Sequence, residues 1–164
     1  MNTGILYTAS TTEKNNFYAG VSVYHLTRPK EEFTGTFYVL NPRATIHAGG
    51  YFPVGERLTL HLSALHSMQA KAHETVAGGA LQFPVGDPEN ADKPVNFYAG
   101  AWMRFGDAII PYIGLEFNDF RLGTTYDINT SQLKTASNSR GGIEISLIYI
   151  KRPAESRGLP CPKF

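Results

Sequence analysis

The feature that most constrains this sequence is a regular alternation of apolar with small or polar residues in its second half. Successive residues of a β-strand point to opposite faces, so a period of two predicts strands with one apolar side. From Val95 to Phe105 every second residue is apolar, whereas Asn96, Trp102 and Arg104 belong to the other side. The same pattern predicts further strands at residues 111–117, 122–128 and 143–149.

The first half repeats this alternation less regularly. It predicts strands from Phe17 to Leu26, Arg43 to Phe52, Arg57 to Ser67 and His73 to Phe83. Three short segments between neighbouring strands contain residues typical of tight turns. These segments are Pro53-Val54-Gly55-Glu56, Gly106-Asp107 and Asn118-Asp119. Longer connections are expected at residues 27–42, 84–94 and 129–138. The chain is therefore predicted to be all-β, an antiparallel meander of about eight strands.

A meander of this size must protect its two edges, and closure into a barrel is the common solution. Charged and histidine side chains gather on the less aliphatic face, namely Arg43, His47, His61, Arg104, Glu116, Asp127 and Glu144. In a membrane barrel this face would line the lumen. In a soluble lipocalin-like barrel that binds a small apolar ligand, the apolar face would turn inward instead. The alternation is the same in both, so these two hypotheses stay open at this point.

Length and composition limit the class of protein to which this sequence can belong. The chain has 164 residues, which suits one domain over 1–164, and a net charge of +1, which gives no reason to expect nucleic acid as a partner. No apolar run is long enough for a membrane-spanning helix. Met1 to Gly4 opens no secretory signal, so either the chain is cytoplasmic or the amino-terminal part that carries its export signal is missing. The single cysteine, Cys161, excludes an internal disulfide.

The end of the chain is expected to leave the barrel. Pro160 and Pro162 remove ladder donors, so residues 152–164 are predicted to form an exposed tail. Phe164 is notable because outer-membrane barrels often end in an aromatic residue, although here it follows the prolines and does not close a strand. We assign no role to Cys161.

Several residue groups suggest chemistry, and in each case a structural role is favoured. His61 and His66 differ by an odd number and would point to opposite faces of a strand, so with His73 they form no metal clamp. Glu116 and Glu144 are interpreted as ion-pair partners of Arg104 and Arg140, not as an acid–base pair. The acidic loop of Asp87, Glu89 and Asp92 lacks the spacing of a calcium loop.

No nucleophile elbow and no phosphate-binding glycine loop is present in the sequence. We therefore predict a protein that is not an enzyme, with no catalytic, cofactor-binding or metal-binding residues. Aromatic residues suggest another role, since lipid-facing barrels carry aromatic girdles at both membrane interfaces. The candidates for such girdles are Tyr7, Tyr51, Tyr98, Trp102, Tyr112 and Tyr126.

Six segments together resemble one known family. They are residues 17–26, beginning Phe17-Tyr18-Ala19-Gly20, then Leu40-Asn41-Pro42-Arg43, residues 111–117 and 122–129, residues 139–147, and the ending Cys161-Pro162-Lys163-Phe164. Their order and spacing are similar to the PorP/SprF family of type IX secretion membrane proteins from Bacteroidota. Members of that family are longer and begin with a signal peptide, so the chain resembles the later portion of one.

The resemblance implies a non-enzymatic barrel in the outer membrane, surrounded by lipid. Its function would be to anchor or assist the secretion and gliding machinery during export of a surface adhesin. The implied partners are the secreted adhesin and the periplasmic ring lipoproteins of the machinery. The family supplies no catalytic residues to place on this sequence, and no cofactor.

Overall fold

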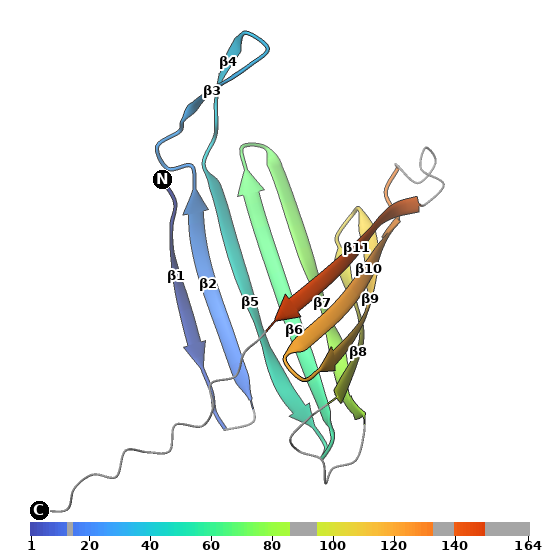
Figure 1. Ribbon diagram of the computed structural model, residues 1–164. Coiled ribbons are helices and arrows are strands. Elements are labelled where there is room, and N and C mark those ends of the chain that lie inside the picture. The colour runs from blue at the N-terminus through green and yellow to red at the C-terminus, as the bar shows by residue number, and fades with distance from the viewer. Residues whose placement is uncertain (13–14, 86–94, 133–139, 150–164) are drawn as a thin grey trace, which may run out of the picture.

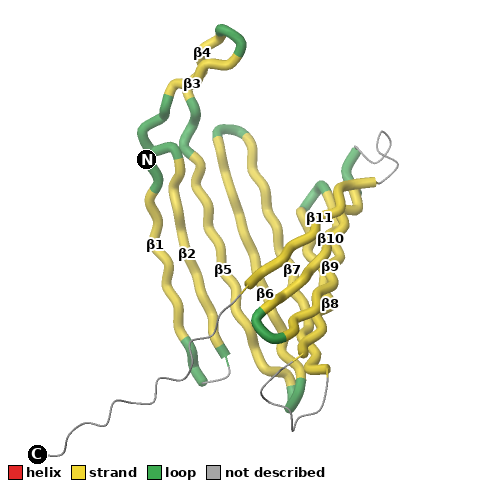
Figure 2. The backbone as a smooth tube through the Cα atoms, in the orientation of Figure 1, coloured by secondary structure: helices red, strands yellow, loops and turns green. Residues whose placement is uncertain are grey.

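The computed structural model describes residues 1–12, 15–85, 95–132 and 140–149, and within them it is all-β (Figures 1 and 2). Its main element is a nine-stranded sheet in the order β1-β2-β5-β6-β7-β8-β9-β10-β11. The strands are β1 (Thr3–Ala9), β2 (Asn16–Tyr24), β5 (Arg43–Val54), β6 (Leu58–Gln69), β7 (Ala72–Val85), β8 (Val95–Arg104), β9 (Ala108–Phe117), β10 (Phe120–Asn129) and β11 (Arg140–Tyr149).

Every neighbouring pair in this sheet is antiparallel, which is the meander that the alternation predicts. The sheet curls strongly, so that β8 to β11 turn toward the viewer while β1, β2, β5, β6 and β7 lie behind them (Figure 1). It does not close, because β1 and β11 form its two edges. The structure is therefore an open, curved β-sheet, as expected of part of a barrel.

The predicted turns lie where the sequence indicated. Gly55 and Gly106 have φ of 67° and 78°, and Asn118 has φ of 53°, so each adopts the left-handed conformation that tight β-turns require. Glycine adopts this conformation without strain, and asparagine tolerates it better than most other residues. These turns join β5 to β6, β8 to β9 and β9 to β10.

The predicted strand count was too low. β1 was not predicted, and the connection expected at residues 27–42 contains a hairpin of β3 (Lys30–Phe33) and β4 (Thr36–Val39). Thr34 and Gly35 join these strands with φ of 51° and 76°, the paired positive values of a type I′ turn. The hairpin projects beyond one rim of the sheet (Figure 1), and Leu40 N donates a 2.9 Å hydrogen bond to Pro29 O at its base.

Other expectations fall on residues outside the described part of the chain. These are the acidic loop with Asp87, Glu89 and Asp92, and the tail at residues 152–164 with Cys161 and Phe164.

The glycine pairs Gly49-Gly50, Gly78-Gly79 and Gly141-Gly142 all lie within strands, in β5, β7 and β11.

Candidate functional site: an apolar outer face and a polar inner face

The two faces of the curved sheet differ sharply in chemistry. We define the inner face by Asn96, Tyr98, Trp102 and Arg104 of β8 and their cross-strand neighbours, and the outer face by the alternate residues. Side chains on the inner face reach across whole strands. Arg121 of β10 contacts Tyr98 of β8 past β9, as expected where a concave surface brings side chains together. The most buried side chains, Ala80, Tyr98, Ala108, Thr45, Asn96 and Glu116, also lie on this face.

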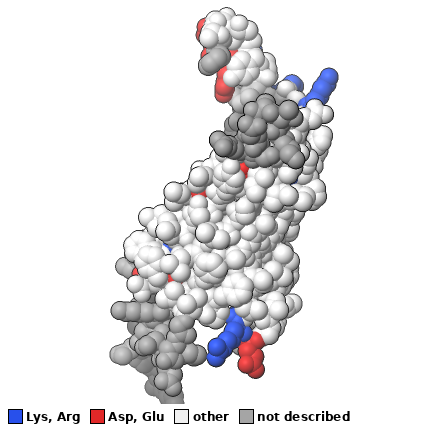
Figure 3. Space-filling view, turned by 90° about the vertical axis from the view of Figure 1, so that its right-hand side faces the viewer, with Lys and Arg blue, Asp and Glu red and all other residues white. Residues whose placement is uncertain are grey.

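All charged side chains in the described strands of the main sheet, from β1 to β10 and from Gly141 onward in β11, lie on the inner face. The register places Arg43, Glu74, Arg104, Glu116, Arg121, Asp127 and Glu144 there. This includes every charged residue that the sequence assigned to the less aliphatic face. On the face of the molecule seen in Figure 3, charged side chains lie mainly toward its two ends, and the surface between them is largely free of Lys, Arg, Asp and Glu.

The outer face is apolar and open to its surroundings. Its exposed side chains include Ile5, Val21, Ile46, Leu62, Phe97, Met103, Ile113, Leu115, Leu122, Ile143, Ile145 and Leu147. Water-soluble proteins rarely expose a continuous apolar surface of this extent. Most strands of the sheet have 10 to 14 residues, which matches the length that a tilted strand needs to cross a bilayer.

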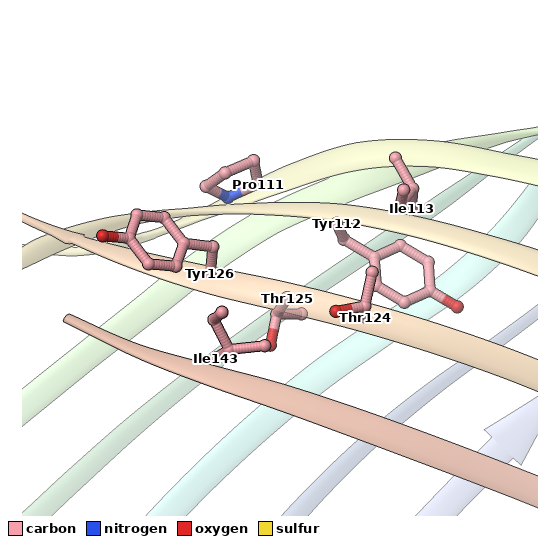
Figure 4. Close-up of a pocket in the computed structure, with 7 residues that line it drawn as sticks. All are labelled: Pro111, Tyr112, Ile113, Thr124, Thr125, Tyr126 and Ile143. Atoms are coloured by element: carbon pink, nitrogen blue, oxygen red, sulfur yellow. The ribbon is translucent and has the colours of Figure 1, made fainter. Parts of the chain in front are cut away.

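A close view of β9 to β11 shows how the faces alternate (Figure 4). Pro111 and Ile113 point to one side of β9, whereas Tyr112 between them points to the other. A hollow of about 320 Å³ at this place is lined by Pro111, Tyr112, Ile113, Thr124, Thr125, Tyr126 and Ile143. The inward ring of Tyr112 lies so close to Gly123 that a Cβ there would be 2.7 Å from its Cε2 atom.

An aromatic girdle runs along one rim of the outer face, but its members are mostly not those predicted. Outward-facing rings cluster at the ends of strands opposite the β3–β4 hairpin, and they are Tyr7, Phe17, Phe52, Phe83, Phe97, Phe117, Phe120 and Tyr149. Several touch across strands, with centroids 6.4 Å apart for Phe83 and Phe97 and 5.0 Å apart for Phe120 and Tyr149.

Of the predicted girdle residues, only Tyr7 and Tyr126 face outward. Tyr51, Tyr98, Trp102 and Tyr112 face inward, so their assignment to a lipid-facing girdle was wrong. The physical reason is that small inner residues let these rings lie flat against the wall. A Cβ on Gly78 would be 2.8 Å from Trp102 Cγ, so a larger residue at that position would displace the indole.

One ion-pair network on the inner face surrounds Glu116. Arg121 pairs with this carboxylate, Tyr98 donates a 2.9 Å hydrogen bond to Oε2, and Asn96 donates one of 3.3 Å to Oε1. The guanidinium of Arg121 also lies 4.5 Å from the centre of the Tyr98 ring. The charge of Glu116, whose side chain is almost fully buried, is thereby matched and hydrogen-bonded.

A second network surrounds Arg104 near the rim that carries the hairpin. Its guanidinium lies 3.2 Å from Glu74, 3.2 Å from Asp107 and 3.1 Å from Asp127. The prediction of an inward ion pair is therefore confirmed for Glu116, but its partner is Arg121, which was not among the predicted partners. The predicted pairing of Glu144 with Arg140 involves a side chain outside those that the structure describes. Arg121 is directly opposite Glu116 across the Asn118-Asp119 turn, and this cross-strand spacing could have identified it.

The structure does not bring His61, His66 and His73 together on one face of the sheet. His61 lies on the inner face, where Nε2 is 2.8 Å from Gln82 Oε1, whereas His66 and His73 lie on the outer face. Among the described residues no group of His, Cys, Asp and Glu could hold a metal ion. The described part of the chain also contains no helix long and apolar enough to span a membrane.

Together, the inward charges, the exposed apolar outer face and the aromatic rim define an integral membrane protein whose strands form part of an outer-membrane-type β-barrel. A family profile described as type IX secretion system membrane protein PorP/SprF matches residues 1–149. The chain therefore belongs to the PorP/SprF family and is a membrane component of the type IX secretion system. No curated protein and no solved structure matches it.

Proposed function

We propose that this chain is the later portion of a non-enzymatic outer-membrane barrel, which anchors or assists the export of a surface adhesin by the type IX machinery. The observation that supports it best is the inward position of Arg43, Glu74, Arg104, Glu116, Arg121, Asp127 and Glu144. A charged side chain is costly at the lipid-facing surface of a barrel and is tolerated in a lumen. The role is therefore binding and positioning, with the wall fixed in the bilayer.

Strand direction supports the proposal that the barrel contains more strands than the nine of this sheet. Eight successive antiparallel steps leave the edge strands β1 and β11 pointing in the same direction (Figure 1). Direct closure would make them a parallel pair. Antiparallel closure instead requires an odd number of additional strands, which gives the even total that bacterial outer-membrane barrels have.

The β3–β4 hairpin is the proposed docking element for the adhesin. It belongs to the connection between β2 and β5, on the rim opposite the end of β11 and the aromatic girdle. Longer connections of outer-membrane barrels face the cell exterior, so this rim is assigned to the outside. Phe37, Tyr38 and Val39 are exposed there and offer apolar contact to a protein partner. Periplasmic ring lipoproteins are assigned to the opposite rim.

A hydrogen bond to a charged side chain links the two strands of the hairpin. Tyr38 donates a 3.1 Å hydrogen bond to Glu31, and that bond together with the charge of the carboxylate raises the pKa of the phenol. This contact links β3 to β4 and helps to present the aromatic side chains on one element.

The proposal is tested by fractionating cells that express the full-length protein, followed by gel migration of boiled and unboiled samples. Sedimentation with outer membranes and a compact unboiled band are expected. Crosslinking then compares the wild-type protein with a variant in which a short turn replaces residues 29–40. Loss of the adhesin crosslink with an unchanged compact band would support docking at the hairpin. An unchanged crosslink would contradict it.

The soluble lipocalin-like barrel is the alternative. It requires an apolar interior for its ligand and a charged exterior, whereas the inner face here carries the charges and the outer face carries Ile113, Leu115 and Leu122. A monomer released into the aqueous fraction without detergent would support that alternative and contradict the membrane barrel.

A further inference from the structure

The inner face contains a ligand-sized pocket that the secretion role does not use. It has a volume of about 290 Å³ and lies over β2, β5, β6 and β8. Its inward-facing lining residues are Asn16, Tyr18, Tyr51, His61, Ser63 and Trp102, and Gly50 and Leu62, which belong to the outer face by register, complete the lining. Ligand pockets in proteins start at about 300 Å³, so this one suits a single ring-sized group. It is separate from the ion pairs of Glu116 and Arg104.

The rings of this pocket are held in place by the wall itself. Trp102 Nε1 donates a 2.7 Å hydrogen bond to Ser63 Oγ, which fixes the indole across Gly78 of the intervening strand. Tyr18 lies across Gly49 in the same way, since a Cβ there would be 2.6 Å from the phenol oxygen. Glycine on the neighbouring strand thus makes room for each ring, and the pocket is formed before any ligand binds.

His61 packs between Tyr51, which also lines the pocket, and Tyr98, which does not. The centroid of the His61 ring lies 6.0 Å from that of Tyr51 and 5.7 Å from that of Tyr98. Its Nε2 atom is hydrogen-bonded to Gln82 Oε1. In the described part of the chain, the phenol oxygens of Tyr18 and Tyr51 make no hydrogen bond. The pocket therefore combines aromatic surfaces with hydroxyl groups that are free to bind a polar ligand.

The lining excludes several ligand classes. It contains no Lys, Arg, Asp or Glu, so a phosphate, a nucleic acid or a strongly charged peptide has no partner there. An extended peptide that binds by adding a strand needs an unpaired sheet edge, whereas β2, β5, β6 and β8 are each paired on both sides. An acyl chain would bury Asn16 and the phenols without hydrogen bonds.

We propose that this pocket binds one pyranose ring of an uncharged glycan. A pyranose has an apolar C–H face that stacks on an aromatic ring, and hydroxyl groups around its rim. Trp102, Tyr18 and Tyr51 supply the stacking surfaces, while Asn16 and the two phenols supply donors and acceptors. This inference does not depend on the adhesin-docking role.

Trp102 makes the proposal directly measurable, because it is the only tryptophan of the 164-residue chain. The full-length protein is solubilised in a detergent without a sugar headgroup and titrated with maltotriose and with the β-linked N-acetylglucosamine trimer. Any tryptophan outside this chain is replaced by phenylalanine beforehand. A saturable change in the emission of Trp102 with at least one trimer is expected.

Tyr51→Ala should weaken the binding about tenfold through loss of a stacking surface. If that variant does not fold, Tyr51→Phe keeps the ring and tests the hydroxyl alone, with a smaller loss expected. Tyr7→Ala on the outer face is the matched control and should bind as the wild type does. Emission unchanged by both trimers, or changed equally in the Tyr51 and Tyr7 variants, would overturn the proposal, as would a response only to an uncharged peptide. The compact unboiled band is read on the same samples, so a failure here is distinct from a failure of the membrane assignment.

Discussion

The substitution Ile113→Arg tests which face of the sheet meets lipid. Ile113 lies near the middle of β9 on the outer face and is 54% exposed. In a bilayer, arginine at the midplane of a barrel costs about 2–4 kcal/mol, because its charge must be moved into hydrocarbon or pull water and headgroups inward. On a soluble protein the same exposed substitution would change stability by only about 0.5 kcal/mol.

Val54→Arg is the matched control. Val54 also faces outward and is 45% exposed, but it ends β5 beside the Gly55 turn, where the interface reduces the cost to about 0–1 kcal/mol. The free energy of unfolding is measured for both variants by denaturant titration in lipid vesicles, with Trp102 emission as the signal. A loss at Ile113 that exceeds the loss at Val54 by about 2 kcal/mol is expected. Equal losses at the two positions would refute the assignment of the outer face to lipid.

Further predictions concern the inner face. Arg121→Ala should lower the free energy of unfolding by about 3 kcal/mol, because it leaves the buried carboxylate of Glu116 without its cationic partner. This value is at the low end of the range for breaking a buried ion pair, since the side chain of Arg121 is itself 27% exposed. Replacing Glu116 by Gln in the same chain should recover much of that loss, measured by the same titration. Gly78→Ala should cost about 1–3 kcal/mol, because the new Cβ would clash with Ala101 O and Trp102 Cα and would also press on the indole. The emission of Trp102 should shift, and an unshifted spectrum would contradict the packing described. Arg104→Ala should make stability depend more strongly on salt, since Glu74, Asp107 and Asp127 would then repel one another, and a titration at two salt concentrations detects it.

Much of the fold could be predicted from the sequence because the alternation is local. The eight predicted strands all exist, and the turns at Gly55, Gly106 and Asn118 join their neighbours as expected. β1 was missed because it is short and places Leu6 on the inner face, which blurs its alternation. β3 and β4 have only four residues each, and the charged residues of β3, Lys30, Glu31 and Glu32, are typical of a loop.

The orientation of the faces could not be predicted because alternation is identical in a soluble and a membrane barrel. The curvature of the sheet determines which face is the inner one. This curvature depends on contacts between strands far apart in the chain, such as that of Trp102 with Ser63. The girdle was mispredicted for a related reason. Tyr98 and Trp102 share a strand face with Asn96 and Arg104, yet an aromatic residue was expected to prefer lipid. The glycines that accommodate these rings lie on other strands, so only the register reveals them.

The most direct test of the central claim is a spin-label scan along β9, from Ala108 to Phe117, in the full-length protein with its native cysteine replaced by serine. Accessibility to oxygen, which concentrates in lipid, is compared with accessibility to a water-soluble nickel complex. The structure predicts oxygen maxima at Ile109, Ile113 and Leu115, and minima at Tyr112 and Gly114. Oxygen maxima at Tyr112 and Gly114, or nickel accessibility throughout the outer positions, would contradict an outer face in lipid and a polar inner face.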